Sequence, residues 1–211
     1  MERCVIVGGA PIGDYNRIKE MLRTDDFMVF CDSGLKHENG LGRKADLIVG
    51  DFDSHENPGR DAETIVLPTE KDDTDSFFAV KEMMRRGFDN FFLIGMIGLR
   101  MDHSLGNLSI LMHLFRAGRK ALLLDDWSEM EIVGQEPAFI SDRFPFFSVF
   151  NLAGTARRIY ITDAKYPLAG ADISWDYQYG VSNEPLPGKC ASVYAEEGEV
   201  LLVRIVKERL L

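Results

Sequence analysis

The stretch Asp46-Leu47-Ile48-Val49-Gly50-Asp51-Phe52-Asp53-Ser54 decides the fold prediction. After Asp46, the residues Leu47–Gly50 form a short apolar run, which is typical of a strand buried on both faces in a parallel sheet covered by helices. Asp51 and Asp53 follow this run directly and are separated by one residue. Because alternate residues of an extended chain point the same way, both carboxylates can face one point. Open α/β sheets bind ligands at the carboxyl ends of their strands, so the stretch predicts such a sheet with an acidic site at that edge.

Working outward from this stretch, short apolar runs alternate with helical patterns through residue 124. The expected strands cover residues 4–8, 27–31, 47–50, 64–67, 91–95 and 121–124, and the expected helices cover 14–22, 73–86 and 104–117. In the third helix, the spacing of four apolar residues predicts one buried stripe, made of Leu105, Leu108, Met112 and Phe115. This alternation predicts βαβ units and an open, mostly parallel α/β sheet.

The pattern changes after residue 124. Short strand candidates follow, without a convincing helix, at residues 131–133, 146–150, 158–161, 191–194 and 200–206. Glycines and prolines separate these candidates, which is typical of a small all-β sandwich. We therefore expect two domains, an α/β domain at residues 1–124 and a β-sandwich domain at residues 125–211.

Composition limits the classes of protein to which the chain can belong. Its 211 residues are 45% hydrophobic and 27% charged, as in ordinary globular proteins. No apolar run is long enough to span a membrane, and the first residues lack the features of a signal peptide. Cys4, Cys31 and Cys190 are too few and too scattered for a disulfide framework or a zinc site, so we expect buried thiols. These features predict a soluble, cytoplasmic protein without a membrane partner.

The net charge of −10 is concentrated in one part of the sequence. Between Asp46 and Asp75, ten acidic residues are accompanied by only two basic ones, Arg60 and Lys71. Such a field repels a nucleic-acid backbone, so we expect no nucleic-acid partner. A solvated acidic loop is the simpler interpretation. However, the Asp51–Asp53 spacing favours a cation site, because two adjacent carboxylates are costly without a cation, and Mg²⁺ binds one or two carboxylates together with phosphate oxygens.

A second acidic cluster, Lys71-Asp72-Asp73-Thr74-Asp75, opens an expected helix. A helix cap with acidic residues in the first turn explains one or two of these side chains. The alternative is a phosphate site, in which backbone N–H groups, Thr74 and Lys71 face the phosphates and one aspartate reaches the metal. Both interpretations remain open at this point.

Two further polar groups follow expected strands. The third expected helix begins near Arg100, Asp102, His103 and Asn107, and the second strand is followed by the turn Cys31-Asp32-Ser33-Gly34. Alone, His103 would be a surface histidine, and an Asp-initiated turn explains Asp32 adequately. Together, the four polar residues at a strand's carboxyl end favour a functional site.

These stretches have the order and spacing found in the thiamine pyrophosphokinase family, which the sequence resembles from about Cys4 to Val206. The combination of Gly-Asp-x-Asp-Ser, Lys-Asp-x-Thr-Asp and Arg-x-Asp-His carries the resemblance. The β region adds Val181-Ser182-Asn183-Glu184. The resemblance implies a homodimer with substrate sites at the subunit interface, and Mg²⁺-dependent transfer of a pyrophosphoryl group from ATP to thiamine, giving thiamine diphosphate and AMP.

The resemblance also assigns roles residue by residue. It implies metal ligands with a catalytic role at Asp51, Asp53 and Asp75. It implies nucleotide and phosphate contacts at Lys71, Asp72, Thr74, Arg100, His103 and Asn107. It implies substrate contacts at Asp32, Asp102, Ser182 and Asn183, with Asp102 also catalytic. Ser182 and Asn183 are expected in a loop at residues 180–185, where turn hydrogen bonds are the simpler interpretation.

The sequence departs from the family pattern at three places. Ser33 replaces a glycine of an Asp-Gly-Gly turn, Leu99 replaces the glycine before the arginine, and the stretch 162–165 differs before Tyr166. The first two changes narrow the expected pocket. Two alternative functions remain open: a metal-dependent nucleotide-sugar transferase that uses Asp51 and Asp53, and a non-catalytic sensor of thiamine or its diphosphate. The transferase would leave the clusters at 71–75 and 100–107 without roles.

Overall fold

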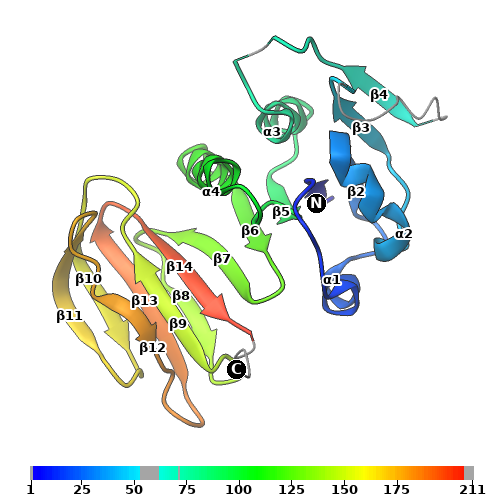
Figure 1. Cartoon of the computed structure of the whole chain (residues 1–211). Helices are drawn as coiled ribbons and strands as arrows, with labels where there is room; N and C mark the ends of the chain where they lie inside the picture. Colours follow the sequence, from blue (N-terminus) through cyan, green and yellow to red (C-terminus); the bar gives the residue numbers. More distant parts are fainter. Residues whose placement is uncertain (1, 53–61, 71, 207–211) are drawn as a thin grey trace. The chain divides into compact units, whose positions relative to one another are not determined.

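The computed structural model describes residues 2–52, 62–70 and 72–206 (Figure 1). Its contacts divide the chain into two compact units, Met1–Asp126 and Trp127–Leu211, and each unit is described by itself. Within the described ranges, no helix is both long and apolar enough to cross a membrane. The α/β class predicted for the first part of the chain, followed by antiparallel β structure, is confirmed.

The first unit is built on a parallel sheet. Its strands are β1 (Cys4–Val7), β2 (Phe27–Cys31), β3 (Leu47–Gly50), β4 (Glu63–Val66), β5 (Asn90–Ile94) and β6 (Lys120–Leu124). They lie in the order β6-β5-β1-β2-β3-β4, and each neighbouring pair is parallel. All residues of β1 and β3 are buried, as expected for strands covered on both faces. The six predicted strands are confirmed, with ends that agree within one residue.

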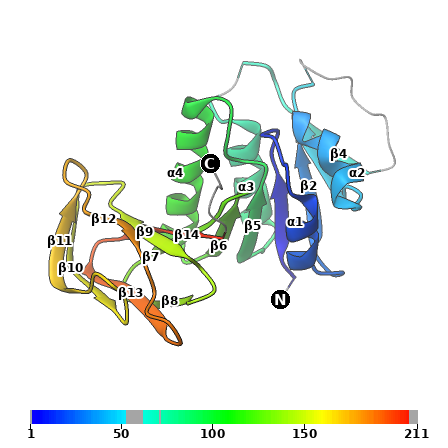
Figure 2. The same cartoon turned by 60° about the horizontal axis from the view of Figure 1, so that its bottom comes forward.

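Helices cover both faces of this sheet (Figure 2). They are α1 (Tyr15–Met21), the 3₁₀ helix η1 (Asp32–His37), α2 (Glu38–Leu41), α3 (Asp75–Arg85) and α4 (Met101–Arg116). Ile18 of α1 and Leu41 of α2 pack with Val5 and Met28 on one face. Helix α3 contacts β1, β2 and β3. The helices η1 and α2 were not predicted, because they are too short to show a helical period.

The buried face of α4 differs from the prediction. Met112 of the expected stripe is buried, but Leu105 is 52% exposed, whereas Ser104, Leu111 and Leu114 are buried. The helix carries apolar residues around most of its circumference, so two neighbouring stripes fit the helical period equally well. Packing against the rest of the unit decides between them, and it turns Asn107 partly inward.

The second unit contains only strands among its described residues. They are β7 (Ser128–Val133), β8 (Ala138–Ser141), β9 (Phe146–Phe150), β10 (Thr155–Thr162), β11 (Leu168–Ser174), β12 (Gly180–Asn183), β13 (Cys190–Glu197) and β14 (Val200–Ile205). They form two antiparallel layers, β12-β9-β14-β7 and β11-β10-β13-β8. Residues such as Phe147, Ile159, Val193 and Leu202 form the buried core of this unit.

Three strands of this unit, β8, β11 and β12, were missed by the sequence analysis. As a result, Ser182 and Asn183 lie in strand β12 rather than in the expected loop. The strand is irregular, because its pairing with β9 shifts between Gly180 and Asn183 and Ser182 has a φ of 56°. It therefore lacks the alternation of buried and exposed residues that identifies a strand.

The cysteines are all free thiols, as predicted, but only two are buried. Cys4 and Cys31 lie inside the first unit, whereas Cys190 is exposed at the start of β13. The expectation of a buried Cys190 was wrong, because this residue lies on the outer side of its strand.

Candidate active site at the carboxyl edge of the parallel sheet

Three carboxylates occur where elements of the first unit meet the carboxyl edge of its sheet. Asp32 follows β2, Asp51 follows β3, and Asp75 is the first residue of α3. Because β2 and β3 are parallel neighbours, their ends lie side by side. The topology therefore brings together residues that are far apart in the sequence.

Asp32 is held against the end of β3. A Cβ atom placed on Gly50 would lie 3.1 Å from the Cβ of Asp32, so the glycine leaves room for this close approach. Asp32 has a φ of 37°, in the left-handed region that residues with a Cβ seldom adopt. Its Oδ1 is buried and has no hydrogen-bond partner within the described part of the chain. A buried carboxylate oxygen without a partner is costly, and a bound cation or donor would remove this cost.

The pKa of the buried Cys31 thiol is affected by the carboxylates around it. Burial raises the pKa of this thiol above its usual value, and the negative charges of Asp75 and Asp32 raise it further. Both carboxylates therefore lie near the same sulfur atom. The raised pKa keeps the thiol neutral, so Cys31 is not a nucleophile at neutral pH.

The predicted metal ligands are only partly within the described residues. Asp51 is half-buried and Asp75 has a buried Oδ1, whereas Asp53 lies outside the described residues. Among the residues that are described, no group of three His, Cys, Asp or Glu side chains could hold a metal ion. The available donors are carboxylate oxygens, which suit Mg²⁺ rather than a thiophilic metal.

The start of α3 uses part of the second acidic cluster for capping. The Thr74 hydroxyl accepts a hydrogen bond from the Phe77 N–H at 3.2 Å, and Asp73 forms an ion pair with Lys81. Asp72 is exposed, and Lys71 lies outside the described residues. The capping interpretation thus accounts for Thr74, and it leaves the predicted phosphate contacts of this cluster untested.

On the other side of β1, Arg100 and Asp102 form an exposed ion pair. The Arg100 Nε and Nη2 donate to the two Asp102 oxygens at 3.1 and 2.5 Å. The hydrogen bond from Arg100 and the one from the His103 backbone N–H lower the pKa of Asp102 to about 2. Asp102 is therefore an anion at neutral pH. The His103 side chain is exposed next to this pair.

Two polar residues of α4 hold the loop between β5 and α4. The Asn107 Nδ2 donates to the Met96 carbonyl at 2.7 Å. The buried Ser104 hydroxyl accepts from the Gly98 N–H and donates to the Arg100 carbonyl, both at 3.1 Å. The amide nitrogen of Asn107 is thus used in a hydrogen bond within the chain. Ser104 was not among the residues singled out from the sequence.

The loop after β1 was also missed by the sequence analysis. It runs beside the loop after β5: the Gly8 N–H donates to the Ile94 carbonyl at 2.9 Å and the Ala10 N–H to the Gly95 carbonyl at 2.8 Å. A Cβ atom on Gly8 would lie 2.5 Å from the Gly95 carbonyl oxygen, so a side chain cannot be placed there. The paired glycines after a buried strand, Gly8-Gly9, are the signal that could have identified this loop.

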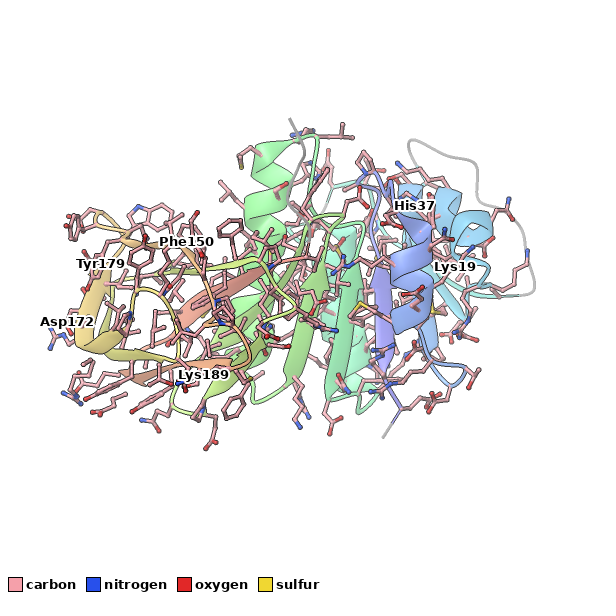
Figure 3. All side chains as sticks on the ribbon, turned by 90° about the horizontal axis from the view of Figure 1, so that it is seen from below. Lys19, His37, Phe150, Asp172, Tyr179 and Lys189 are labelled. Atoms are coloured by element: carbon pink, nitrogen blue, oxygen red, sulfur yellow. The ribbon has the colours of Figure 1, made fainter. Side chains whose placement is uncertain are left out.

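Distant residues fix the same loop. The buried His37, which is labelled in Figure 3, donates from its Nε2 to the Ala10 carbonyl at 2.9 Å, and its Nδ1 accepts from the Tyr15 hydroxyl at 2.7 Å. Burial lowers the pKa of His37 and outweighs the hydrogen bond to the Ala10 carbonyl, which raises it. The positive charge of Lys36 lowers the pKa further, so the ring is neutral at neutral pH. The Asp126 carboxylate accepts hydrogen bonds from the Gly13 and Asp14 N–H groups. The loop is therefore a rigid part of the edge.

In the second unit, the Asn183 side chain joins two segments. Its Oδ1 accepts from the Tyr166 and Glu184 N–H groups at 3.0 and 2.9 Å, and its Nδ2 donates to the Tyr166 carbonyl at 2.7 Å. Asn183 is buried, whereas Ser182 is exposed and donates its backbone N–H to the Ser148 hydroxyl at 3.0 Å. This geometry gives Asn183 a structural role within the unit and leaves the Ser182 hydroxyl at the surface.

Several unusual backbone conformations occur at the predicted sites. Among the described residues other than glycine, a positive φ occurs at Asp32, Phe52, Leu99 and Ser182, within or next to the predicted sites, and also at Arg158 and Asp163 of the second unit. Such conformations cost energy and concentrate at functional sites.

Comparisons with known proteins give a consistent result. A family model described as "Thiamin pyrophosphokinase, catalytic domain" matches residues 18–123. The thiamine pyrophosphokinase of Bacillus subtilis (strain 168) is 26% identical over 163 residues, which are 74% of this chain and 76% of that protein.

Solved structures agree over nearly the whole chain. The thiamine pyrophosphokinase structure from Bacillus subtilis has a TM-score of 0.86 at 19% identity and covers 99% of this chain and 100% of its own. The structure from Geobacillus thermodenitrificans has a TM-score of 0.83 at 24% identity and covers 100% of both chains. The enzyme from Candida albicans has a TM-score of 0.80 at 11% identity, covering 98% of this chain and 89% of its own. At these identities, the structures establish a shared fold.

Proposed function

Because the chain belongs to the thiamin pyrophosphokinase family, we propose that it transfers a pyrophosphoryl group from ATP to the hydroxyl oxygen of thiamine. The products are thiamine diphosphate and AMP. The observation that carries the proposal is the position of Asp32, Asp51 and Asp75 at the carboxyl edge of the sheet, where the Asp32 Oδ1 is buried without a partner among the described residues. Transfer at phosphorus depends on positioning and on charge stabilisation, so a nucleophilic side chain is not required.

Asp51, Asp53 and Asp75 would hold Mg²⁺ in this proposal. Bound Mg²⁺ neutralises phosphate charge and orients the phosphate oxygens. Two features support the fit: the donors are carboxylate oxygens, and Asp32 Oδ1 is a buried oxygen for which the described residues provide no partner. The carboxylates in turn need positive charge between themselves and the phosphates, because ATP is an anion.

The remaining residues of the first unit would bind the nucleotide and orient the acceptor. Contacts with nucleotide and phosphate are assigned to Lys71, Asp72, Thr74, Arg100, His103 and Asn107. Arg100 is exposed and can exchange its Asp102 partner for a phosphate, which it would bind through the same two donors. Asp102, with its pKa of about 2 beside Arg100, is a weak base there. Its proposed catalytic role is therefore electrostatic, as an anion facing the thiamine cation.

Thiamine contacts are proposed for each unit separately. Asp32 and Asp102 would contact thiamine from the first unit, which we assign as the catalytic unit. Ser182 and Asn183 would do so from the second unit, through the exposed Ser182 hydroxyl and through the Tyr166 segment that Asn183 holds. We further propose a cytoplasmic homodimer with its substrate sites at the subunit interface and without a nucleic-acid partner.

A product assay tests the proposal. The protein is incubated with ATP, Mg²⁺ and thiamine, and the products are separated by chromatography. We expect AMP and thiamine diphosphate in equal amounts, and no reaction when Mg²⁺ is chelated. ADP with thiamine monophosphate would contradict pyrophosphoryl transfer. Binding of thiamine without turnover would indicate a sensor, and turnover of a nucleotide sugar alone would indicate the transferase.

A further inference from the structure

The topological switch point of the parallel sheet lies between β1 and β5. The strands β2, β3 and β4 follow on one side of β1, and the chain then crosses to the other side for β5 and β6. In open α/β sheets, ligands such as nucleotides bind outside the carboxyl ends of the strands at such a point. Two loops meet there, because the Ala10 N–H after β1 donates to the Gly95 carbonyl after β5 at 2.8 Å. Side chains beside the loop after β1 are therefore placed to contact a nucleotide.

The 3₁₀ helix η1 holds two polar side chains against this loop. It packs on the end of β1, where a Cβ atom on Gly34 would lie 2.3 Å from the Val7 carbonyl oxygen. Side chains three residues apart share one side of a 3₁₀ helix, so Ser33 and Lys36 point the same way. The Lys36 Nζ donates to the Gly9 carbonyl at 2.6 Å. A Cβ atom on Gly9 would lie 1.9 Å from the Ser33 hydroxyl oxygen, so both side chains lie against the same glycine.

Lys36 carries a positive charge that no carboxylate neutralises within the described part of the chain. Its side chain is exposed, and the partner of its Nζ there is the uncharged Gly9 carbonyl. In contrast, Arg100 at the same edge of the sheet forms an ion pair with Asp102. A lysine ammonium group has three hydrogen-bond donors, so two remain for a ligand. The end of β1 therefore offers a positive charge together with unused donors.

The chemistry of these groups favours a phosphate over the other parts of the proposed substrates. Lysine binds phosphate oxygens as a point charge, and a serine hydroxyl can donate one further hydrogen bond to them. Thiamine is a cation, which the Lys36 ammonium repels, and the adenine ring carries no charge. Because the switch point is where nucleotides bind in this kind of sheet, the phosphate is that of the nucleotide.

We propose that Lys36 and Ser33, beside Gly9, form a subsite for a phosphate group of the nucleotide substrate. This inference rests on the proposed function, in which ATP is the donor of the pyrophosphoryl group. The subsite places positive charge at the end of β1, next to the strand ends that Asp32 and Asp51 follow. Lys36 was not among the residues singled out from the sequence, because no motif includes it.

Binding measurements on three variants test this subsite. Lys36→Met removes the charge and keeps the length of the side chain, Lys36→Arg keeps the charge, and Ser33→Ala removes only the hydroxyl. Calorimetric titrations use ATP, adenosine and thiamine diphosphate. We expect Lys36→Met to bind ATP about tenfold more weakly and Ser33→Ala about threefold more weakly, because each loses a contact with phosphate. Lys36→Arg should remain within about threefold of the unmodified protein, and all three variants should bind adenosine as it does.

Lys19→Met is the matched control for the loss of charge. Lys19, labelled in Figure 3, is an exposed lysine in the last turn of α1. The helix begins after the loop that follows β1 and leads back to the start of β2, so its last turn lies away from the carboxyl edge. Lys19→Met should therefore bind ATP as the unmodified protein does. Equal losses in Lys19→Met and Lys36→Met would show an effect of net charge alone and would overturn the subsite.

The other outcomes separate the subsite from its alternatives. Weaker binding of adenosine as well as ATP, or a fall in melting temperature that accounts for the loss, would make Lys36 an anchor of the loop and overturn the subsite. Weaker binding of thiamine diphosphate with unchanged binding of ATP would overturn the assignment to the nucleotide. Unchanged affinity of Lys36→Met for ATP, in a protein that forms thiamine diphosphate, would overturn the subsite and leave the proposed function intact. An unmodified protein that neither binds ATP nor forms thiamine diphosphate would overturn both proposals.

Discussion

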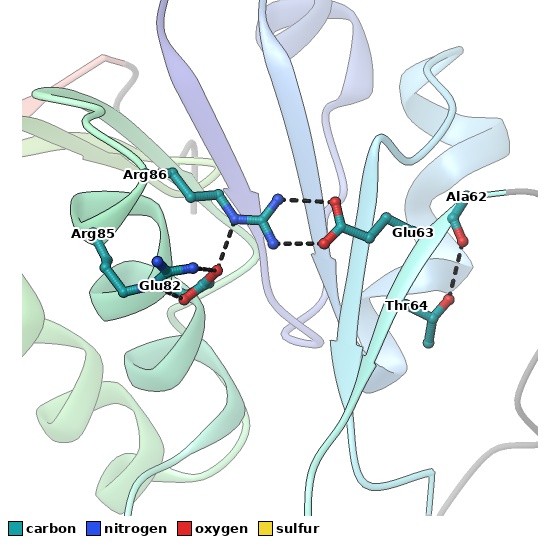
Figure 4. A network of polar contacts seen from close by, with 6 residues as sticks. All are labelled: Ala62, Glu63, Thr64, Glu82, Arg85 and Arg86. Atoms are coloured by element: carbon teal, nitrogen blue, oxygen red, sulfur yellow. Dashed lines mark hydrogen bonds and ion pairs between the residues drawn. The ribbon is translucent and has the colours of Figure 1, made fainter.

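The two edges of the parallel sheet in the first unit differ in whether their buried carboxylate oxygens have partners within the described part of the chain. At the amino edge, the Arg3 guanidinium donates to both oxygens of the buried Asp26 at 2.8 and 2.7 Å. On the same edge, Arg86 at the end of α3 binds Glu63 at the start of β4 and also Glu82 (Figure 4). At the carboxyl edge, Asp32 keeps a buried oxygen without a partner among the described residues.

This difference suggests that the charges of the amino edge stabilise the fold, whereas those of the carboxyl edge serve ligand binding. The charge pairs of the amino edge, such as Arg3 with Asp26, satisfy one another and are not available to a ligand. The buried Asp32 oxygen, which has no partner among the described residues, is costly in the unliganded chain and could accept a cation or a donor. We therefore expect substitutions at the amino edge to change the free energy of unfolding and substitutions at the carboxyl edge to change turnover.

The largest expected effect is on turnover at the carboxyl edge. Asp75→Asn removes a charge from the proposed metal site while keeping the size of the side chain. We expect kcat to fall by about 100-fold or more, as when a main electrostatic contact in an active site is lost. The melting temperature should fall only slightly, because Asp75 is an acidic residue in the first turn of α3 and loses a modest interaction with the helix dipole. A Glu136→Gln control removes an exposed charge in the second unit. Near-normal turnover of Asp75→Asn at limiting Mg²⁺ would contradict the metal assignment.

The next effect is on stability at the amino edge. Asp26→Asn leaves the Arg3 guanidinium without its charged partner, and the Asp26 and Arg3 side chains are 0% and 10% exposed. We expect a loss of roughly 3–5 kcal/mol in the free energy of unfolding, measured by urea denaturation. Turnover per folded molecule should remain close to that of the unmodified protein at low temperature. If Asp26→Asn lowered kcat without lowering stability, the amino edge would contribute to turnover, and the proposed difference between the two edges would be wrong.

A smaller effect is expected where two loops of the carboxyl edge touch. A Cβ atom on Gly9 would lie 1.9 Å from the Ser33 hydroxyl oxygen, so Gly9→Ala forces this side chain to move. We expect Gly9→Ala to lower the free energy of unfolding by about 1–3 kcal/mol, the usual cost of overpacking. Adding Ser33→Gly should restore most of the loss. Additive effects in this double-mutant cycle would show that the two positions do not interact.

The smallest effect concerns pH. Because burial lowers the pKa of His37 in the folded chain, protonation favours the unfolded state. The contribution of His37 to stability is complete above its unfolded pKa of about 6.5 and decreases as the pH falls through that value. We expect His37→Gln to lose less melting temperature between pH 7 and pH 5 than the unmodified protein. Equal losses would show that other groups cause the decrease.

The sequence predicted the strands of the first unit well, because each is an apolar run bounded by polar residues. It was less informative where an element is short or irregular. The helices η1 and α2 contain only six and four residues, and β12 contains Ser182 in a left-handed conformation. The candidate site was identified from motifs, but the capping role of Thr74 and the anchoring role of Asn107 required the structure.

The order of residues along the chain is enough to predict that strands and helices alternate, that β structure follows, and that acidic residues occur directly after β3 and before α3. These properties depend on neighbours along the chain, which periodicity and motif spacing record. Only the tertiary structure decided which face of α4 is buried, that Asp126 and His37 fix the loop after β1, and that Asp32 approaches Gly50. Such contacts join residues far apart in sequence, and their distances are set by how the elements pack rather than by the spacing of residues along the chain.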